Sequence, residues 1–406
     1  MKLPDNRLLV ISEIGCGPPY LGNRIRMRAL LREIRQLGLE IHFAGVALSE
    51  EEKLATGPCV DQWVFDFQPC STPKSTHLVG RIARKLRHLL FGQSIIRETP
   101  PRIDKGVDQW FHPHWSAQAR KLQRTGKYQR VLVAYVFHSA FFECFPDTCL
   151  KILDTHDVFA DRAAKLEGQG IGNFWFTLDV TEERRGVLRA DVILAIQHEE
   201  AGHFRKLTGG RREIRTVGHF VEPRILAHTG TQMSAPCCGY LASDNPINVD
   251  GITWFLGNIW PEVLLHAPTA RLLIGGRICK LLDAMPSVDL LGEVATVEDF
   301  YSRCLFTINP MRGGTGLKIK TVESLSYGRA VVTTTVGAEG ITGHLRDGFE
   351  VCDDAHEFAG AITRWLASPE AAISRGAAAV EAMSEFNRSS HEELSRSLRM
   401  PSAMKR

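Results

Sequence analysis

The sequence predicts an α/β protein made of two doubly wound parallel-sheet domains that face each other across a cleft. Three observations lead to this prediction. Short apolar, β-branched runs alternate with helical patterns over most of the chain. These runs lack strict alternation of apolar and polar residues, which is typical of parallel strands buried on both faces. A chain of 406 residues is longer than one compact domain usually is, so two domains are expected.

Residues 1–222 are expected to form the first domain. A strand at residues 7–12, “RLLVIS”, precedes an amphipathic helix at residues 24–38 that ends at Gly38, because glycine is a common helix stop. The next apolar run, residues 40–48, is expected to be the following strand. Further strands of this sheet are expected at residues 130–136, 150–156 and 190–197.

A polar, turn-rich segment at residues 223–236 is expected to link this domain to a second one over residues 237–367. The alternation of strands and helices restarts there. Strands are expected at residues 237–243, 270–276, 288–292, 304–310 and 329–336, with a helix around residues 249–263. The charged pattern of residues 368–406 predicts a helical tail that packs back across the junction of the two domains.

The composition excludes several classes of function. The net charge of +3 is close to balance and does not indicate a nucleic-acid partner. The ten cysteines form no C-x-x-C pair and no Cys/His cluster with zinc spacing, so we expect free thiols in a reducing compartment and no metal site. The N-terminus lacks the apolar segment of a secretion signal, and the most apolar window, residues 131–145, is too short to span a membrane. A cytoplasmic protein is therefore expected.

The strongest candidate for a ligand-binding site is the segment of residues 309–334, “NPMRGGTGLKIKTVESLSYGRAVVTT”. A strand ends before a turn of small residues, and a helix follows from about residue 317 to a stop at Gly328. Glycines let backbone N–H groups approach a ligand closely, and a helix N-terminus offers unpaired N–H donors with partial positive charge. This order of elements favours a phosphate-binding site.

Three charged side chains on this helix extend the interpretation. Lys318 and Lys320 lie in the first turn, where cations oppose the helix dipole unless an anion offsets them. Glu323 follows on the same face and can accept hydrogen bonds from the paired hydroxyls of a ribose. Glycines alone are more often an ordinary turn, and surface lysines alone are usually solvated. The combination predicts a nucleotide-diphosphate site.

Two loops follow strands of the first domain. In “GCGPPYLGN”, residues 15–23, the first two glycines resemble a dinucleotide fingerprint, but the third is missing and two prolines stiffen the loop, so no nicotinamide cofactor is expected. In “DTHDVFADR”, residues 154–162, His156 and Asp157 follow a strand directly. His156 could be a general base, or a structural residue in a loop where Asp157 caps the next helix. The sequence leaves both interpretations open.

A basic amphipathic pattern covers residues 80–92, “GRIARKLRHLLFG”. A helix of this kind can lie on an anionic membrane, although most such helices are surface helices with one face on a core. Peripheral contact with the inner face of the cell membrane is therefore an open expectation.

The segment “GGTGLKIKTVESLSYGRAVVTT” resembles the donor-binding signature of GT-B retaining glycosyltransferases of family 4, the glycosyl transferases group 1. “DNPINVDGITWFLGNIWPEVLLHAPTARLLIGG” and “GAEGI” are similar to segments of the same family, as are “GPPYLGNRIRMRALLREIRQLG” and “ILDTHDVFADR” in the first half. The resemblance implies two facing Rossmann-like domains and a hexosyltransferase-type enzyme of polysaccharide biosynthesis. Such an enzyme moves a sugar from a nucleotide-diphosphate sugar, its co-substrate, to an acceptor hydroxyl, with retention and without a metal or other cofactor.

The resemblance also implies roles for individual residues. Glu323 would hold the donor ribose, while His156, Lys318 and Lys320 would be the catalytic group around the sugar and its leaving diphosphate. Gly22, Asn23 and Asp157 would form the loop that reaches the phosphates and the acceptor. The remaining donor-binding positions would be Gly313, Gly314, Thr315, Gly316, Leu317, Gly292 and Val294, the last two beside the base.

This chain departs from the family pattern in two places. The first glutamate of the E-x7-E motif would fall at Thr315, so that carboxylate is not available to the donor sugar. The Arg and Lys that clamp the diphosphate are missing from “YLASDNPINVDG”, which follows the first strand of the second domain. Lys318 and Lys320, with Arg312, would have to supply the positive charge.

Two other functions remain open at this point. A GT-B-like sugar-nucleotide epimerase would use a similar donor site. A catalytically weak relative that only binds nucleotide sugars would explain the missing glutamate and the missing clamp. The acceptor could be a glycan, a lipid-linked sugar or a small molecule.

Overall fold

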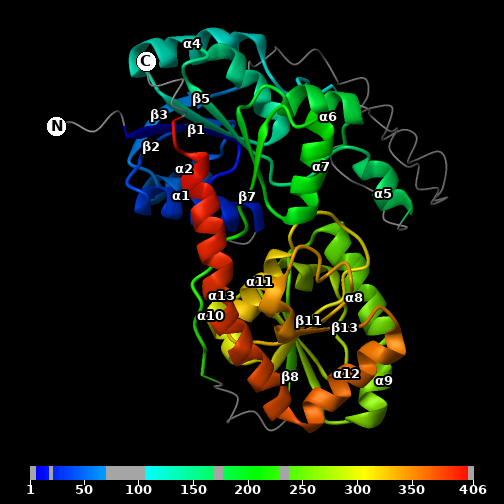
Figure 1. The fold of residues 1–406 in the computed structure, drawn as a ribbon. Helices are drawn as coiled ribbons and strands as arrows, with labels where there is room; N and C mark the ends of the chain where they lie inside the picture. The colour runs from blue at the N-terminus through cyan, green and yellow to red at the C-terminus, as the bar shows by residue number, and fades with distance from the viewer. Residues whose placement is uncertain (1–5, 18–21, 70–105, 169–176, 228–236, 401–406) are drawn as a thin grey trace, which may run out of the picture.

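The computed structural model describes residues 6–17, 22–69, 106–168, 177–227 and 237–400. They form two α/β domains, one above the other in Figure 1, and each is built on a parallel sheet. Residues 80–92, where the sequence suggests a membrane-surface helix, lie outside the described residues. Within the described part of the chain, no helix is long and apolar enough to cross a membrane.

The N-terminal domain contains a seven-stranded sheet in the order β3-β2-β1-β4-β5-β6-β7, with all neighbours parallel. The strands are β1 (Arg7–Ser12), β2 (Glu40–Val46), β3 (Gln62–Phe67), β4 (Arg130–Ala134), β5 (Leu150–Asp154), β6 (Val192–Ala195) and β7 (Glu213–Thr216). The helices are α1 (Gly22–Gln36), α2 (Glu50–Thr56), η1 (Gly57–Cys59), α4 (Pro113–Gly126), η2 (Val136–Cys144), α5 (Arg162–Gly168), α6 (Val180–Val187) and α7 (His198–Thr208).

The C-terminal domain contains a six-stranded parallel sheet in the order β10-β9-β8-β11-β12-β13. The strands are β8 (Cys237–Leu241), β9 (Arg271–Gly275), β10 (Val288–Gly292), β11 (Phe306–Asn309), β12 (Val331–Thr333) and β13 (Phe349–Val351). The helices are α8 (Pro246–Asn258), α9 (Trp260–His266), η4 (Arg277–Leu281), α10 (Val297–Ser302), α11 (Ile319–Ser326), η5 (Gly343–Gly348) and α12 (Ala355–Ala367).

Burial explains why these strands carry continuous apolar runs. In β1, the side chains from Leu8 to Ile11 are all removed from water, because helices cover both faces of the sheet. The helix α1 turns Met27, Leu30 and Ile34 onto the same core. Each sheet thus has its own core, and loops at the carboxyl ends of the strands remain for a site.

The long helix α13 (Pro369–Ser397) joins the two domains. Ala372 and Met383 are buried in the C-terminal domain, whereas Leu394 is buried in the core of the N-terminal domain. The hydroxyl of Ser390 accepts a hydrogen bond from the Gly218 amide at 3.1 Å. Figure 1 shows α13, in orange to red, alongside both domains. This helix helps to hold the two sheets in one relative arrangement.

The predicted doubly wound parallel-sheet fold is confirmed. The strand β1 has the expected bounds, while α1 ends at Gln36, before the expected Gly38. The strands β3, β7 and β13 were not predicted from the sequence, and all three lie at an edge of their sheet. An edge strand pairs on one side only and is less buried, so its sequence carries no continuous apolar run.

Candidate active site

The turn after β11 is held by polar side chains of its own domain. Asn309, the last residue of β11, donates through Nδ2 to Thr321 Oγ1 at 2.9 Å, which ties the strand end to α11. Gly314 and Gly316 have φ values of +130° and +77°, where an L side chain is strained. The turn therefore requires glycine at both positions. The helix α11 begins at Ile319, later than the sequence suggested.

Lys318 occupies the N-cap position of α11 and is buried. Its Nζ donates to the Gly316 carbonyl at 2.6 Å and pairs with Glu339 Oε2 at 3.0 Å. Burial lowers the pKa of Lys318, and the charge of Glu339 opposes that shift. The ammonium group thus lies inside the site, and Glu339 balances part of its charge.

Lys320 lies two residues further on, in the first turn of α11, and has a different environment. Its Nζ approaches Asn248 Oδ1 and lies 5.1 Å from the centre of the Tyr240 ring. No carboxylate among the described residues forms an ion pair with it. Burial, together with the nearby charge of Lys318, lowers the pKa of Lys320 to about 7. Asn248 belongs to α8, so Lys320 reaches the segment in which the family's basic clamp is missing.

Glu323 is oriented by a tyrosine. The Tyr301 hydroxyl donates to Glu323 Oε2 at 3.0 Å. Burial raises the pKa of Glu323 to about 7; the Tyr301 hydrogen bond works against this shift and the charge of Glu298 adds to it. Gly292 ends β10 with φ +69°, and Val294 packs on the apolar cluster that contains Tyr301. The positions expected beside the base and the ribose thus adjoin one cluster.

The turn before α11 faces the N-terminal domain. Thr315 Oγ1 donates to Asp157 Oδ2 at 2.9 Å across the domain boundary. A Cβ built on Gly316 would lie 3.6 Å from Asp157 Oδ1 and 3.7 Å from Glu200 Oε1. Leu317 is buried in a cluster that includes Ile196 of the N-terminal domain. The positive end of α11 is thus directed at the opposite domain.

Gly22 and Asn23, the first residues of α1, adjoin the same boundary. A Cβ on Gly22 would lie 3.1 Å from Ile319 Cδ1, so the absence of a side chain lets α1 and α11 approach each other. Asn23 Nδ2 donates to the Tyr135 hydroxyl at 3.3 Å. This contact fixes the start of α1 to the carboxyl end of β4.

Asp157 does not cap the following helix, so that structural alternative is wrong. The helix α5 begins only at Arg162, and Asp157 Oδ2 pairs with the Arg162 guanidinium at 3.0 Å. Its Oδ1 accepts the Val158 amide at 2.9 Å. Asp157 is held by its own domain and contacts Thr315 of the other.

His156 is buried and has a left-handed backbone, with φ +59°. Its Nε2 lies 3.1 Å from Asp154 Oδ2, and Asp154 Oδ1 accepts from Arg26 at 2.7 Å. Burial lowers the pKa of His156 to about 4, although the Asp154 charge opposes this. A histidine with this pKa is neutral near pH 7 and is a weak general base. The lowered pKa of His156 thus favours a contact role over proton abstraction.

Two acidic residues that follow strand ends, Glu13 and Glu200, were not predicted from the sequence, and neither was the burial of Glu183. Glu13, after β1, lies with Oε2 2.9 Å from His138 Nε2. Glu183 of α6 is buried and accepts the Phe159 amide at 2.7 Å, which supports the loop of His156. Glu200, in the first turn of α7, faces Gly316. Their position after carboxyl strand ends is the signal that could have identified Glu13 and Glu200.

Arg312 was expected to contribute charge to the diphosphate site. It is exposed and pairs with Asp250 Oδ1 at 2.6 Å, with its guanidinium 5.6 Å from the centre of the Trp254 ring. Asp250 and Trp254 direct the guanidinium toward α8, and a contribution of Arg312 to the diphosphate site stays a prediction.

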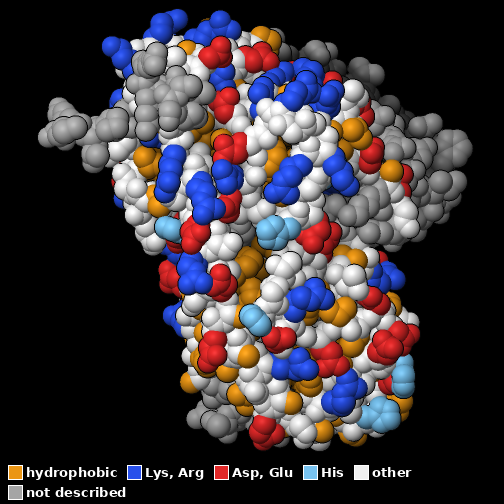
Figure 2. Space-filling model, in the orientation of Figure 1, with side chains coloured by type: hydrophobic (Ala, Val, Ile, Leu, Met, Phe, Trp, Pro, Cys, Tyr) orange, Lys and Arg blue, Asp and Glu red, His pale blue; other side chains and the backbone are white. Residues whose placement is uncertain are grey.

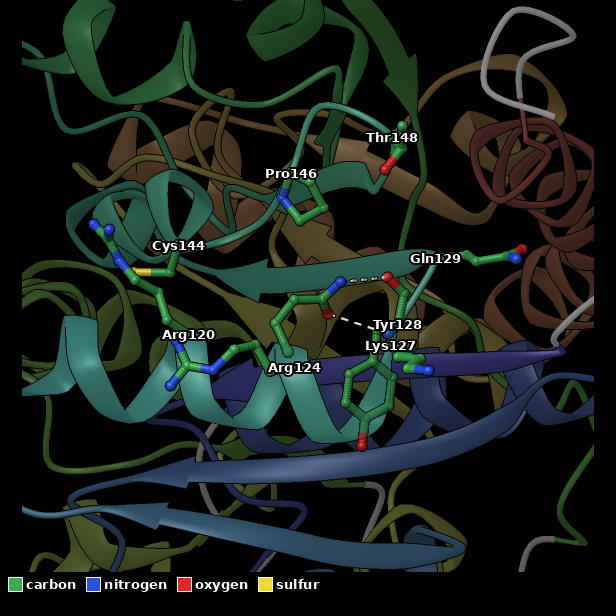
Figure 3. Close-up of a pocket in the computed structure, with 9 residues that line it drawn as sticks. Arg120, Arg124, Lys127, Tyr128, Gln129, Cys144, Pro146 and Thr148 are labelled. Atoms are coloured by element: carbon green, nitrogen blue, oxygen red, sulfur yellow. Dashed lines mark hydrogen bonds between the residues drawn. The ribbon is translucent and has the colours of Figure 1, made fainter. Parts of the chain in front are cut away.

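A separate cavity lies on the N-terminal domain, and Figure 3 shows the side chains that line it. They surround the amino ends of β4 and β5, whereas the site described above lies at the carboxyl ends of the strands. Gln123 Nε2 donates to the Tyr128 carbonyl at 3.1 Å and closes the end of α4. Figure 2 shows Lys and Arg side chains gathered over α4. Exposed cations near a helix C-terminus stabilise the helix itself, which explains the charges around the cavity. Because the cavity lies at the amino ends of the strands, it is not the candidate site.

Comparison with known proteins links this geometry to a family. Residues 235–368 match the family model described as Glycosyl transferases group 1. An uncharacterized 44.6 kDa protein in the cps region of Klebsiella pneumoniae is 29% identical over 108 residues. That match covers 23% of this chain and 28% of the length of the relative.

Solved structures resemble the chain over nearly its full length. Sucrose-phosphate synthase from Thermosynechococcus elongatus superposes with a TM-score of 0.68 at 14% identity, covering 95% of this chain and 97% of that one. Anabaena HepE in complex with UDP and glucose superposes with a TM-score of 0.63 at 12% sequence identity, covering 96% of this chain and 98% of that one. WaaG, a glycosyltransferase involved in lipopolysaccharide biosynthesis, superposes with a TM-score of 0.55 at 12% sequence identity, covering 95% of this chain and 98% of that one. At such identities these likenesses show the fold alone.

The fold defines the structural class of this chain: two facing parallel-sheet α/β domains, the GT-B fold that it shares with these solved structures. Within that class, residues 235–368 form a domain of the family Glycosyl transferases group 1.

Proposed function

We propose that this protein transfers a sugar from a nucleotide-diphosphate sugar to an acceptor hydroxyl, with retention of configuration and without a metal. One observation carries the proposal: two lysine side chains lie at the start of α11, directly after the turn that contacts the opposite domain. Lys318 is buried there, and Lys320 has no described carboxylate as an ion-pair partner. Cations in such a position gain most from a bound anion with several charges, such as a diphosphate.

The order of groups along α11 fits the order of groups in a nucleotide sugar. Lys318 and Lys320 would contact the diphosphate, together with the backbone amides of Gly313, Gly314 and Gly316. Glu323, which Tyr301 orients, would accept the ribose hydroxyls. The base would lie beyond the ribose, near Gly292 and Val294, which adjoin the Tyr301 cluster.

In the reaction the bond between the sugar's anomeric carbon and the diphosphate oxygen breaks, and negative charge develops on that oxygen. Lys318, Lys320 and the amides at the N-terminus of α11 would stabilise this charge, which is electrostatic catalysis of leaving-group departure. The leaving phosphate oxygen would accept the proton of the acceptor hydroxyl, which attacks the same face of the sugar. His156, neutral at pH 7, would contact the sugar or the leaving group.

The acceptor side would be formed by the N-terminal domain. Gly22, Asn23 and the Glu13–His138 pair lie at the carboxyl ends of its strands or at the helix that follows. A carboxylate hydrogen-bonded to a histidine can bind and orient an acceptor hydroxyl. A glycan or lipid-linked acceptor, made at the inner face of the cell membrane during polysaccharide synthesis, agrees with the family resemblance.

A thermal-shift screen with UDP-, GDP-, ADP- and TDP-sugars tests the donor class, because a ligand that binds the folded state raises the melting temperature according to its affinity. UDP and UDP-glucose come first, since the HepE structure contains UDP and glucose. The anomeric configuration of the product, followed by NMR, then tests retention.

The variants Lys318→Ala and Lys320→Ala distinguish an enzyme from a binding relative. We expect donor hydrolysis and transfer to fall by about a hundredfold or more, as for loss of a group that stabilises developing charge. Lys206→Ala, which changes an exposed lysine of α7, is the matched control. Unchanged turnover in the double variant, or no nucleotide sugar that shifts the melting temperature, would contradict the proposal.

A further inference from the structure

Glu200 has an environment that the fold alone does not explain. It lies in the first turn of α7 and is 4% exposed. Within the described residues, neither of its carboxylate oxygens has a hydrogen-bond partner at bonding geometry. A buried carboxyl group without donors is costly, so such groups are rare in folded proteins unless a ligand or water completes them.

The charges around Glu200 do not compensate this cost. Burial raises the pKa of Glu200 well above its usual range, and the neighbouring Asp157 raises it further. Arg26, Lys318 and the Ile196 amide offset only part of the shift. The carboxyl group of Glu200 therefore keeps its proton unless a ligand supplies hydrogen-bond donors to it.

Other unsatisfied polar atoms lie on the same side of the domain boundary. Gln197 Oε1, one residue before α7, is buried and accepts no hydrogen bond from the described residues. Asp154 Oδ2 lies beside His156 Nε2 without a hydrogen bond between them that meets normal geometry. These atoms are acceptors, and Gln197 Oε1 lies against Gly340 of the opposite domain. A ligand with several hydroxyl groups matches such a surface.

We propose that Glu200 binds hydroxyl groups of the transferred sugar and thereby helps to select the donor. This inference rests on the proposed function, because it places the sugar next to the diphosphate at Gly316. Glu200 Oε1 lies 3.7 Å from where a Cβ on Gly316 would stand, one residue from Thr315. Thr315 is where the family resemblance leads one to expect a sugar-binding carboxylate, and the carboxylate here comes from the opposite domain.

Glu200 belongs to the N-terminal domain, whereas Gly316 belongs to the C-terminal domain. A sugar bound beside Glu200 and the Gly316 turn would contact both domains at once, so binding energy would depend on their approach to each other. Free nucleotide, which lacks the sugar, would make none of these contacts. The two ligands therefore separate the role of Glu200 from the roles of Lys318, Lys320 and Glu323.

The test compares dissociation constants of UDP and UDP-glucose, and of GDP and GDP-mannose, measured by calorimetry on the full chain. In Glu200→Ala we expect the nucleotide sugar to bind about ten- to a hundredfold more weakly, the effect of losing hydrogen bonds to a charged group. The free nucleotide should bind within about twofold of the wild type, because it contacts only groups that remain. Glu200→Gln, which keeps an acceptor oxygen, should give an intermediate loss.

Glu199→Ala is the matched control, since Glu199 is the exposed neighbour on the same helix. Glu200→Ala should also raise the melting temperature of the unliganded protein, because it removes an uncompensated buried group. Equal weakening of nucleotide and nucleotide sugar, or no weakening of either, would overturn the role of Glu200. If the wild type binds neither nucleotide nor nucleotide sugar, the proposed function itself is refuted, and this inference with it.

Discussion

The hydroxyl of Thr315 donates a 2.9 Å hydrogen bond to Asp157 Oδ2 and so connects the glycine-rich turn of one domain to a loop of the other. Arg162 and the Val158 amide hold Asp157 on its own side. The residues that join the domains are thus the same residues that would surround the donor. Substrate binding and domain contact are expected to be coupled at this place.

Thr315→Val should weaken this coupling, because it keeps the side-chain shape and removes the hydroxyl. Asp157 retains Arg162, so the expected loss is that of one hydrogen bond, about 1 kcal/mol. The KM for the donor should then rise about fivefold, as measured in initial-rate assays. Thr315→Ser, which keeps the hydroxyl, is the control. Equal KM values for the Val and Ser variants would show that the bond has no role in donor binding.

Gly340→Ala should interfere with the approach of the two domains. A Cβ at Gly340 would lie 1.8 Å from Gln197 Oε1 of the N-terminal domain. We expect turnover to fall on the order of tenfold to a hundredfold, because small displacements of reacting groups reduce rates strongly. Small-angle scattering should show a wider separation of the domains.

Gly343→Ala is the matched control for that variant. Gly343 has φ +64°, close to the +82° of Gly340, but a Cβ there would meet nothing within 4 Å. Both variants suffer the same backbone strain, whereas only Gly340→Ala causes a contact between domains. If the two lose turnover to the same extent, strain within the C-terminal domain explains the effect and the domain contact does not.

Lys320 should take up a proton when a nucleotide diphosphate binds. Its pKa of about 7 in the unliganded protein leaves it mostly neutral at pH 8, and a bound diphosphate would raise that pKa. Calorimetry at pH 8 in buffers of different ionisation enthalpy should therefore report proton uptake. In Lys320→Arg the guanidinium is charged at pH 8 with and without the nucleotide. This variant should therefore abolish the proton uptake while it retains binding. Identical proton uptake in wild type and variant would assign it to another group.

Stability should depend on pH through Glu323. Its folded-state pKa of about 7 lies above the ordinary value of 4.5, so the folded protein holds this proton over a range in which the unfolded chain has lost it. The contribution of Glu323 to the free energy of unfolding is then fully present below pH 4.5 and is lost as pH rises toward 7. Glu323→Gln should make the decline smaller, as measured by urea unfolding between pH 4.5 and 8; the part that remains includes Glu200, whose pKa is also raised by burial. A decline of the same size in the variant would contradict the assignment.

Local patterns in the sequence determined the fold and the centre of the candidate site. Continuous apolar runs determined the buried parallel strands, because a strand covered by helices on both faces tolerates few polar side chains. The glycines at 314 and 316 and the charges at 318, 320 and 323 were recognisable because a turn and a helix N-terminus impose backbone and charge requirements on neighbouring residues. Edge strands such as β7 lacked this signal.

Tertiary structure alone decided which distant side chains meet these groups. Asp157 and Thr315 are separated by 158 positions, and no local pattern records their contact. The same holds for Asn248 beside Lys320 and for Glu200 opposite Gly316. These neighbours depend on how two separate sheets are held together by α13 and by close contacts at glycines. Neighbouring residues in the sequence determine the local conformation of each segment. The burial and the charged neighbours of a side chain at the domain boundary are set only when the segments pack.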